Sequence, residues 1–376
     1  MKQNAFVFGD TKPHYELLDG LRGVAALLVI WYHVFEGFAA SPMDQKFNHG
    51  YLAVDFFFIL SGFVVGYAYD DRWGRSLTAK GFIKRRLIRL HPMVIAGAVL
   101  GTASFFIQGC QQWSGASVSP LWAVLAMLMT VFMIPAIPGT GPEVRGNGEM
   151  FPLNGPQWSL FFEYIGNILY ALVIRKMSTK ALKVLVAVSG ICLAAFSIFN
   201  FSGYWNLGVG WSLSGYNFPG GFLRMSFAFS MGLLMSRNFR PVKIRGAFWI
   251  CSVAVAVLLA IPYVGGTENS WMNGIYDALC TVVLFPAIVY LGASGTAGGN
   301  TTSGICRFLG DISYPVYIIH YPSMYLFYSW VWKNGLAFQQ VWPVASGLFV
   351  GNIVLAYLFL KFYDEPVRKM LGRRFL

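Results

Sequence analysis

An all-α bundle of transmembrane helices is the fold class that the sequence predicts, with about ten spans and one re-entrant segment. Hydrophobic residues make up 56% of the 376 residues and charged residues 12%, about half the charged fraction of a typical soluble domain. The mean hydropathy is +0.55. Apolar stretches that approach the roughly 20 residues of a membrane span follow one another along nearly the whole chain, and short basic tracts separate them.

Eleven apolar stretches are candidates for these spans. The first contains Arg22, is long for a signal peptide and has no convincing small-residue cleavage site after it, so we expect it to remain as the first span. The stretches are 17–38, 51–69, 93–108, 121–138, 158–174, 181–200, 222–236, 247–264, 275–292, 312–331 and 341–362.

Lys and Arg mark the loops that are expected to face the cytoplasm. Seven lie between 72 and 89, four between 175 and 183, four between 237 and 245, and five between 361 and 374. An even number of crossings must join the first two tracts, whereas the sequence offers three apolar stretches there. We therefore expect one stretch between 93 and 138 to be re-entrant or buried without crossing. Both termini are then cytoplasmic.

The net charge of +12 comes from 28 Lys and Arg against 16 Asp and Glu. In a soluble protein this surplus would suggest nucleic acid, but here the basic residues lie between apolar stretches, which indicates contact with membrane lipids and not a nucleic-acid surface. Five cysteines lie far apart along the chain, and no two have the C-x-x-C spacing of a metal or redox site. No bound metal is expected.

The first span carries an acid, a base and an imidazole. His33 follows Arg22 by 11 residues, which returns it to within about 20° of the same helix face, about 16 Å further along the axis and close to the membrane midplane. Asp19 is one turn before Arg22. A donor held at Arg22 could then reach His33. His33 could act on it as a general base or as a transient nucleophile. The structural alternative is that Asp19 and Arg22 only pair and that His33 is a hydrogen-bonded bundle residue.

Two further groups extend this candidate site. Arg86 and Arg89 are three apart and share a helix face, which suits forked binding of phosphates, although an anchor for lipid headgroups is the simpler interpretation. Glu163 lies one turn inside a span and could relay protons for a histidine or accept a bond from a neighbouring helix. We count it with His33 and Asp19 as a candidate catalytic residue.

Supporting roles are predicted for four other polar residues in apolar stretches. Asp55 and Ser61 could hold the first span by hydrogen bonds. Tyr314 lies in a Ser-Tyr-Pro motif, and His320, taken alone, is more often structural than catalytic. Arg224 and Asp277 also enter apolar stretches, and the sequence offers a partner for neither.

Taken together, the motifs resemble the acyltransferase-3 family of membrane O-acyltransferases, over residues 17 to about 370. The residues that carry the resemblance are Leu18-Asp19-Gly20-Leu21-Arg22-Gly23 with His33, Asp55-Phe56-Phe57 with Ser61-Gly62-Phe63, Arg85-Arg86-Leu87-Ile88-Arg89 with Pro92, Trp158-Ser159-Leu160 with Glu163, Ser313-Tyr314-Pro315-Val316-Tyr317 with His320, and Phe362-Tyr363-Asp364-Glu365-Pro366.

The resemblance implies an acyl-CoA donor, most often acetyl-CoA, with no bound cofactor, and an acceptor hydroxyl on lipopolysaccharide, exopolysaccharide or a lipid-linked sugar. Arg22 and His33 match the family's essential pair, Arg86 and Arg89 its cytoplasmic R-x-x-R, and Glu163 its acidic position after W-S-L. The protein would then be a multi-pass enzyme of the inner (plasma) membrane. Some members carry a soluble esterase-like domain, whereas residues 1–376 are expected to form a single transmembrane domain.

A transporter or flippase of an acylated or glycosylated lipid is the alternative, because buried charges in a bundle of ten spans are also typical of transport pathways. Chemistry at His33 distinguishes the two classes, since transport needs no base inside the membrane. The sequence leaves open the acyl group, the acceptor sugar, the oligomeric state and whether His33 becomes acylated.

Overall fold

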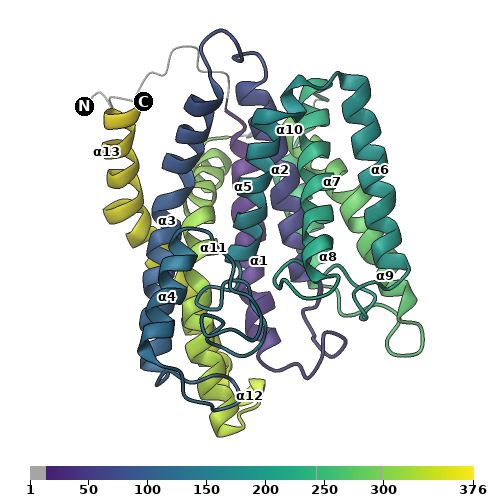
Figure 1. The fold of residues 1–376 in the computed structure, drawn as a ribbon. Helices are drawn as coiled ribbons and strands as arrows, with labels where there is room; N and C mark the ends of the chain where they lie inside the picture. The colour runs from purple at the N-terminus through teal and green to yellow at the C-terminus, as the bar shows by residue number, and fades with distance from the viewer. Residues whose placement is uncertain (1–13, 243, 297–298) are drawn as a thin grey trace.

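The computed structural model describes residues 14–242, 244–296 and 299–376. Throughout these residues the chain forms helices and loops without a β-strand, which confirms the all-α prediction (Figure 1). The expected cytoplasmic N-terminus falls outside the described residues. The helices are α1 (Glu16–Glu36), α2 (Ala53–Tyr69), α3 (Ala79–Ile107), α4 (Pro120–Val131), α5 (Gln157–Leu172), α6 (Thr179–Ile198), α7 (Asn217–Arg237), α8 (Ala247–Ala260), α9 (Trp271–Leu279), α10 (Phe285–Ser294), α11 (Asn300–Asn334), α12 (Phe338–Phe359) and α13 (Glu365–Phe375), with short turns η1 (His49–Leu52), η2 (Ile174–Lys176), η3 (Cys280–Leu284) and η4 (Leu360–Asp364).

Several helices are long and apolar enough to cross a membrane. Within the described part of the chain there are six: Glu16–Glu36, His49–Tyr69, Ala79–Ile107, Thr179–Ile198, Trp271–Ser294 and Phe338–Phe375. The protein is therefore a polytopic helical membrane protein, and the total of ten spans stays a prediction. Helix α4, in the region where one stretch was expected not to cross, has 12 residues and is shorter than the roughly 20 that a span needs.

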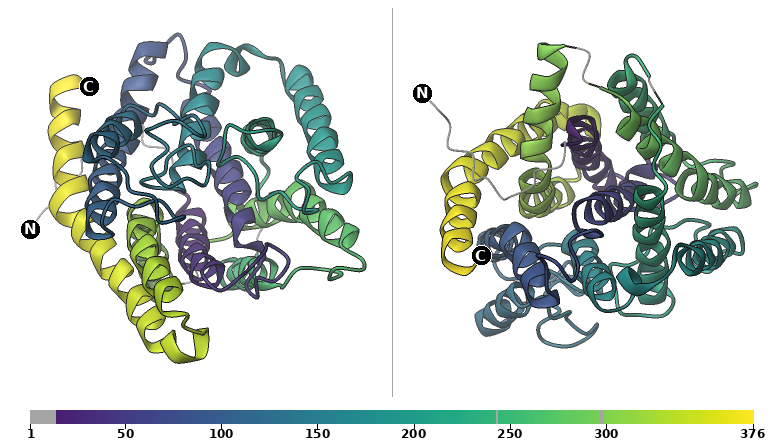
Figure 2. Two further views of the ribbon diagram at one scale, coloured as in Figure 1. Left: turned by 60° about the horizontal axis from the view of Figure 1, so that its bottom comes forward. Right: turned by 90° about the horizontal axis from the view of Figure 1, so that it is seen from above.

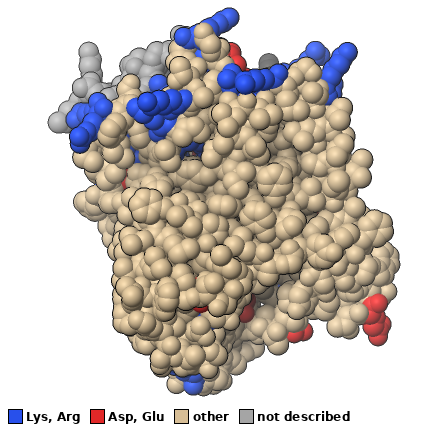
Figure 3. All heavy atoms as spheres, in the orientation of Figure 1, with Lys and Arg blue, Asp and Glu red and all other residues tan. Residues whose placement is uncertain are grey.

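The outer surface of the bundle suits a lipid environment. Large apolar side chains such as Ile191, Val253 and Val350 are more than half exposed on α6, α8 and α12. Figure 3 shows Lys and Arg side chains gathered along one end of the face in view and a middle band almost without charge. Asp and Glu lie near the opposite end, together with a small Lys or Arg patch at its tip. We call these the basic end and the acidic end. By the distribution of basic residues, the basic end is the expected cytoplasmic side.

Two helix pairs form the centre of the bundle. Helix α1 packs along α11, and α2 packs along α7, and in the end-on view of Figure 2 the purple N-terminal helices lie inside the ring of later helices. Close approach depends on glycine. A Cβ on Gly23 would collide with the backbone of Leu309, and one on Gly62 with the backbone of Phe229. Small residues at such contacts allow the backbones of membrane helices to meet.

The basic tract after the second span is part of a helix. Helix α3 begins at Ala79, where the Thr78 side chain accepts a hydrogen bond from the Gly81 amide, and continues for 29 residues. It therefore includes Arg86 and Arg89 as well as the predicted stretch 93–108. This continuity fixes the direction of both arginines relative to the bundle.

Candidate functional site

A cationic cavity opens at the basic end of the bundle, and we call it the inner cavity. Its volume is about 430 Å³, and it is lined by residues of α1, α2, α3, α5 and α11. Four guanidinium groups line it, against the two carboxylates of Asp19 and Glu163. The surplus of positive charge suits a polyanionic ligand such as a phosphate. The four arginines are Arg22, Arg85, Arg86 and Arg89.

The inner cavity brings together most of the predicted site residues. Arg22 Nη1 lies 2.8 Å from Asp19 Oδ1, so the expected pair one turn apart forms. Arg86 Nη2 donates to Glu163 Oε1 at 2.7 Å, and Ser61 Oγ donates to the same oxygen at 2.8 Å. Glu163 is therefore the partner of an arginine and not of a histidine.

Arg89 and Tyr314 also line the inner cavity. Arg89 is exposed and lines the cavity beside Arg86, as their shared helix face predicts. The Tyr314 hydroxyl donates to the Leu90 carbonyl oxygen at 2.5 Å and ties α11 to α3. Ser61, which was expected to hold the first span, instead contacts Glu163 of α5.

A second cavity, the outer cavity, lies toward the acidic end, has a volume of about 270 Å³ and contains His33. His33 Nδ1 is 2.7 Å from Glu36 Oε2, one helical turn further along α1. The Tyr328 hydroxyl lies 2.6 Å from the His33 carbonyl oxygen and 3.1 Å from Glu36 Oε2. Because a carboxylate can only accept, Nδ1 of His33 donates this hydrogen bond.

The His33 ring is enclosed by side chains of α11. It stacks on His320 with 5.3 Å between ring centroids and meets Tyr321 edge-on at 4.6 Å. His320 is buried, its Nδ1 lies 3.0 Å from the Val316 carbonyl oxygen, and its Nε2 has no partner among the described residues. His320 thus belongs to the packing around His33.

Two side chains lie where the two cavities meet. Val54 and Tyr317 line both of them, and Tyr317 Oη is held 2.6 Å from Ser159 Oγ. Of the residues expected to line a single channel, Arg22 and Glu163 line the inner cavity and His33 lines the outer one. His33 also lies in the last turn of α1 and not near its middle, because the helix ends at Glu36.

A buried ion pair crosses between α2 and α7. Arg224 Nη2 lies 2.6 Å from Asp55 Oδ2, and neither side chain has any exposed surface. The Arg224 guanidinium also donates to the carbonyl oxygens of Val209 and Tyr51, at 2.8 Å each. Asp55, expected to hold the first span, instead fixes an arginine that lines the outer cavity.

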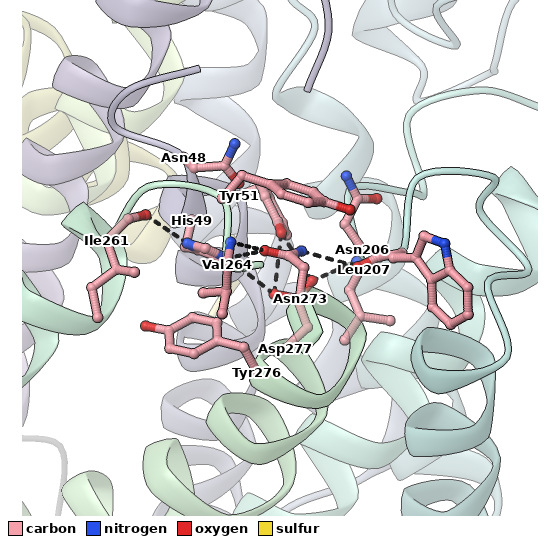
Figure 4. Close-up of polar contacts among 12 residues, drawn as sticks. Asn48, His49, Tyr51, Asn206, Leu207, Ile261, Val264, Asn273, Tyr276 and Asp277 are labelled. Atoms are coloured by element: carbon pink, nitrogen blue, oxygen red, sulfur yellow. Dashed lines mark hydrogen bonds and ion pairs between the residues drawn. The ribbon is translucent and has the colours of Figure 1, made fainter. Parts of the chain in front are cut away.

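Asp277 finds its partners in a polar cluster shown in Figure 4. It accepts from the Tyr51 hydroxyl at 2.9 Å and from the Leu207 amide at 2.7 Å. Asn273, one turn before it, donates to the Trp205 carbonyl oxygen at 2.9 Å and lies 2.9 Å from His49 Nε2. The cluster fastens the loop after α6 to α9, and this loop carries Gly208 and Trp211 of the outer cavity.

A family model described as an acyltransferase domain matches residues 15–361. The chain belongs to the acyltransferase-3 family. It is therefore an acyltransferase, and its reaction requires binding of an acyl donor and an acceptor. Among the described residues, no group of three or more His, Cys, Asp or Glu is arranged to hold a metal ion.

Three curated relatives of this acyltransferase-3 protein are similar over much of their length. It is 26% identical over 388 residues to acyltransferase MdmB of Streptomyces mycarofaciens, which covers 95% of this chain and 92% of that protein. It is 26% identical over 352 residues to the exopolysaccharide production protein ExoZ of Rhizobium meliloti strain 1021, and this alignment covers 86% of the chain and 92% of that protein. It is 34% identical over 187 residues to protein 2 in the picA locus of Rhizobium radiobacter, covering 47% and 91%. No solved structure matches the chain.

Sequence reasoning missed two carboxylates of the acyltransferase-3 outer cavity. Glu36 follows His33 by three residues, and that helical spacing could have identified it. Glu149 lies in the loop between α4 and α5, where no local periodicity points to the cavity, and it accepts from the Tyr325 hydroxyl at 2.5 Å.

Proposed function

We propose that the protein transfers an acyl group, acetyl in the simplest case, from cytoplasmic acyl-CoA to a hydroxyl of a cell-surface or lipid-linked sugar. The donor's phosphates bind the arginines of the inner cavity, and its thioester arm passes between Val54 and Tyr317. The acceptor occupies the outer cavity. The observation that carries the proposal is the pair of cavities with a common wall, one cationic and the other containing an imidazole with a free nitrogen.

In this reaction His33 is the general base. Its Nε2 takes the proton from the acceptor hydroxyl as the oxygen attacks the thioester carbonyl carbon. The carbon–oxygen ester bond forms, the carbon–sulfur bond breaks, and the proton is passed to the departing CoA thiolate. Glu36 holds the Nδ1–H tautomer and stabilises the imidazolium that forms during transfer, as the acid of a Ser-His-Asp triad does.

Replacement of His33 tests this assignment. We expect His33→Ala to abolish acylation of surface glycans, measured by mass spectrometry, while the protein still accumulates in the membrane. The matched control is His91→Ala on α3, since His91 contacts Tyr164 and lines neither cavity. Parental acylation by His33→Ala at normal abundance would show that His33 is structural and that the mechanism is wrong.

A further inference from the structure

The outer cavity has the dimensions of a single sugar ring. Its volume of about 270 Å³ lies just below the roughly 300–1,000 Å³ of sites for drug-sized ligands. Four indole rings line it, from four different segments of the chain. Their flat apolar faces match the C–H faces of a pyranose. These residues are Trp113, Trp158, Trp211 and Trp332.

Acidic groups dominate the charges that line the outer cavity. Glu36 and Glu149 both line the cavity, and Arg224, which also lines it, is neutralised by Asp55. The Arg145 guanidinium packs on the rings of Trp113 and Tyr325 and does not itself line the cavity. Four of the five Arg224 N–H donors are already occupied by Asp55, Val209 and Tyr51. Little positive charge is therefore available to an incoming anion.

We propose that the outer cavity binds one uncharged sugar ring and excludes sugars that carry a carboxylate or phosphate. The inference rests on the proposed function and adds the chemical class of the acceptor. Hydroxyl groups donate to the carboxylates of Glu36 and Glu149, which can only accept. An anionic group would meet these carboxylates at close range where water is largely replaced by protein, so the repulsion is stronger than in water.

The hydrogen bonds of Glu36 give a second reason to exclude a charged acceptor, because the acceptor must not displace the partners that Glu36 already has. That carboxylate already receives His33 Nδ1 and the Tyr328 hydroxyl. A sugar hydroxyl can share its remaining lone pairs, whereas a charged group would disturb the contact that places a hydrogen on His33 Nδ1. Glu36 thus helps to select the acceptor and also orients the imidazole of His33.

Binding can be measured without turnover. Because four tryptophans line the cavity, a bound ring should change the intrinsic fluorescence of the purified protein in nanodiscs. The two probes are methyl β-glucopyranoside and methyl β-glucuronide, which differ only at the sixth carbon. At about pH 8 we expect the glucoside to bind at least about tenfold more tightly than the glucuronide.

A variant that lacks the charge of Glu149 tests whether this carboxylate causes the difference in affinity between the two sugars. Glu149→Gln keeps the shape of the side chain and should bring the two dissociation constants closer together by several-fold. The control is Glu268→Gln, an exposed carboxylate at the acidic end that lines neither cavity and should leave the ratio unchanged.

Three outcomes would overturn the inference: a glucuronide that binds as tightly as the glucoside, a glucoside that does not bind, or a ratio that Glu149→Gln leaves unchanged. None of them would overturn the proposed function, because that depends on whether surface glycans lose their acyl groups in His33→Ala.

Discussion

The His33–Glu36 contact makes the imidazole depend on a carboxylate one helical turn away. We expect Glu36→Gln to lower kcat by about 10²-fold or more, within the range that general-base catalysis supplies, because an amide cannot stabilise the imidazolium. The KM for the acyl donor should stay near its parental value, since Glu36 lies in the other cavity from the arginines. Steady-state kinetics with acetyl-CoA would measure both constants.

The control for this variant is Asp44→Asn, an outer-loop carboxylate that is bound by Ser41 and lines neither the inner nor the outer cavity. Turnover of Glu36→Gln equal to that of Asp44→Asn would show that Glu36 does not assist the base.

Arg86 and Arg89 should act on the donor alone. Replacing both with Ala is expected to raise the KM for acyl-CoA at least about tenfold, because two phosphate partners are lost, and to leave the KM for the acceptor almost unchanged. Lys180 and Lys183 on α6 form a matched control, since they are also basic, exposed and three residues apart. If both double variants weaken the donor equally, the arginines are lipid anchors and not a phosphate site.

Glu149 should make stability depend on pH. Burial raises the pKa of Glu149 from 4.5 to about 7, so the folded protein binds this proton more tightly than the unfolded chain. The stability that it contributes is full below about pH 4.5 and is lost as the pH rises through about 7. Relative to Glu149→Gln, the parental protein should therefore show a falling Tm between about pH 5 and 8. Parallel Tm curves for the two proteins would contradict the assignment.

At the scale of single residues, the sequence predicts which charged side chains pair within one helix. It does not predict which side chains pair between two helices. Asp19 and Arg22 pair as their spacing requires. Of the two alternatives for Glu163, a histidine partner or a bond from a neighbouring helix, the structure shows the second, with Arg86, and Asp55 meets Arg224, 169 residues away. Such contacts depend on which helices are neighbours, and no local periodicity encodes that.

Helices α2 and α7 are joined by charge as well as by close packing. Asp55→Ala would leave the fully buried Arg224 without its counterion, which typically destabilises a protein by about 3–5 kcal/mol. We expect a clear fall in the Tm of the purified protein in detergent. The double variant Asp55→Leu, Arg224→Met should recover much of this loss, because no charge is then left unpaired. A double variant no more stable than Asp55→Ala would mean that the polar contacts to Tyr51 and Val209 matter more than the ion pair.

The apolar stretches predict where helices lie better than where they end. The predicted spans 17–38 and 51–69 match α1 and α2 closely. The stretch 93–108, in contrast, corresponds to the second half of α3, and 312–331 omits the first third of the 35-residue α11. Basic residues and Pro315 interrupt the apolar pattern without ending these helices, because tertiary packing overrides local preference.

For the molecule as a whole, the basic end should face the cytoplasm and ten segments should cross. Single cysteines at Lys46 and Lys333, in a cysteine-free background, are expected to react with a membrane-impermeant maleimide on intact cells. Cysteines at Lys180 and Arg240 should react only after permeabilisation. All four positions are exposed in the structure. Labelling of Arg240→Cys from outside would reverse the orientation, and labelling of all four would contradict the number of crossings.

The wall formed by Val54 and Tyr317 has a consequence for the cell's energy supply. An open passage wide enough for an acyl-pantetheine arm would also conduct protons and small ions, and so would discharge the electrochemical gradient across the membrane. Val54 and Tyr317 lie where the two cavities meet, with Tyr317 tied to Ser159. Packed together they would let each solution reach its own half of the site while the membrane stays electrically tight. The donor arm would then replace the wall as the seal for the moment in which it lies between these residues.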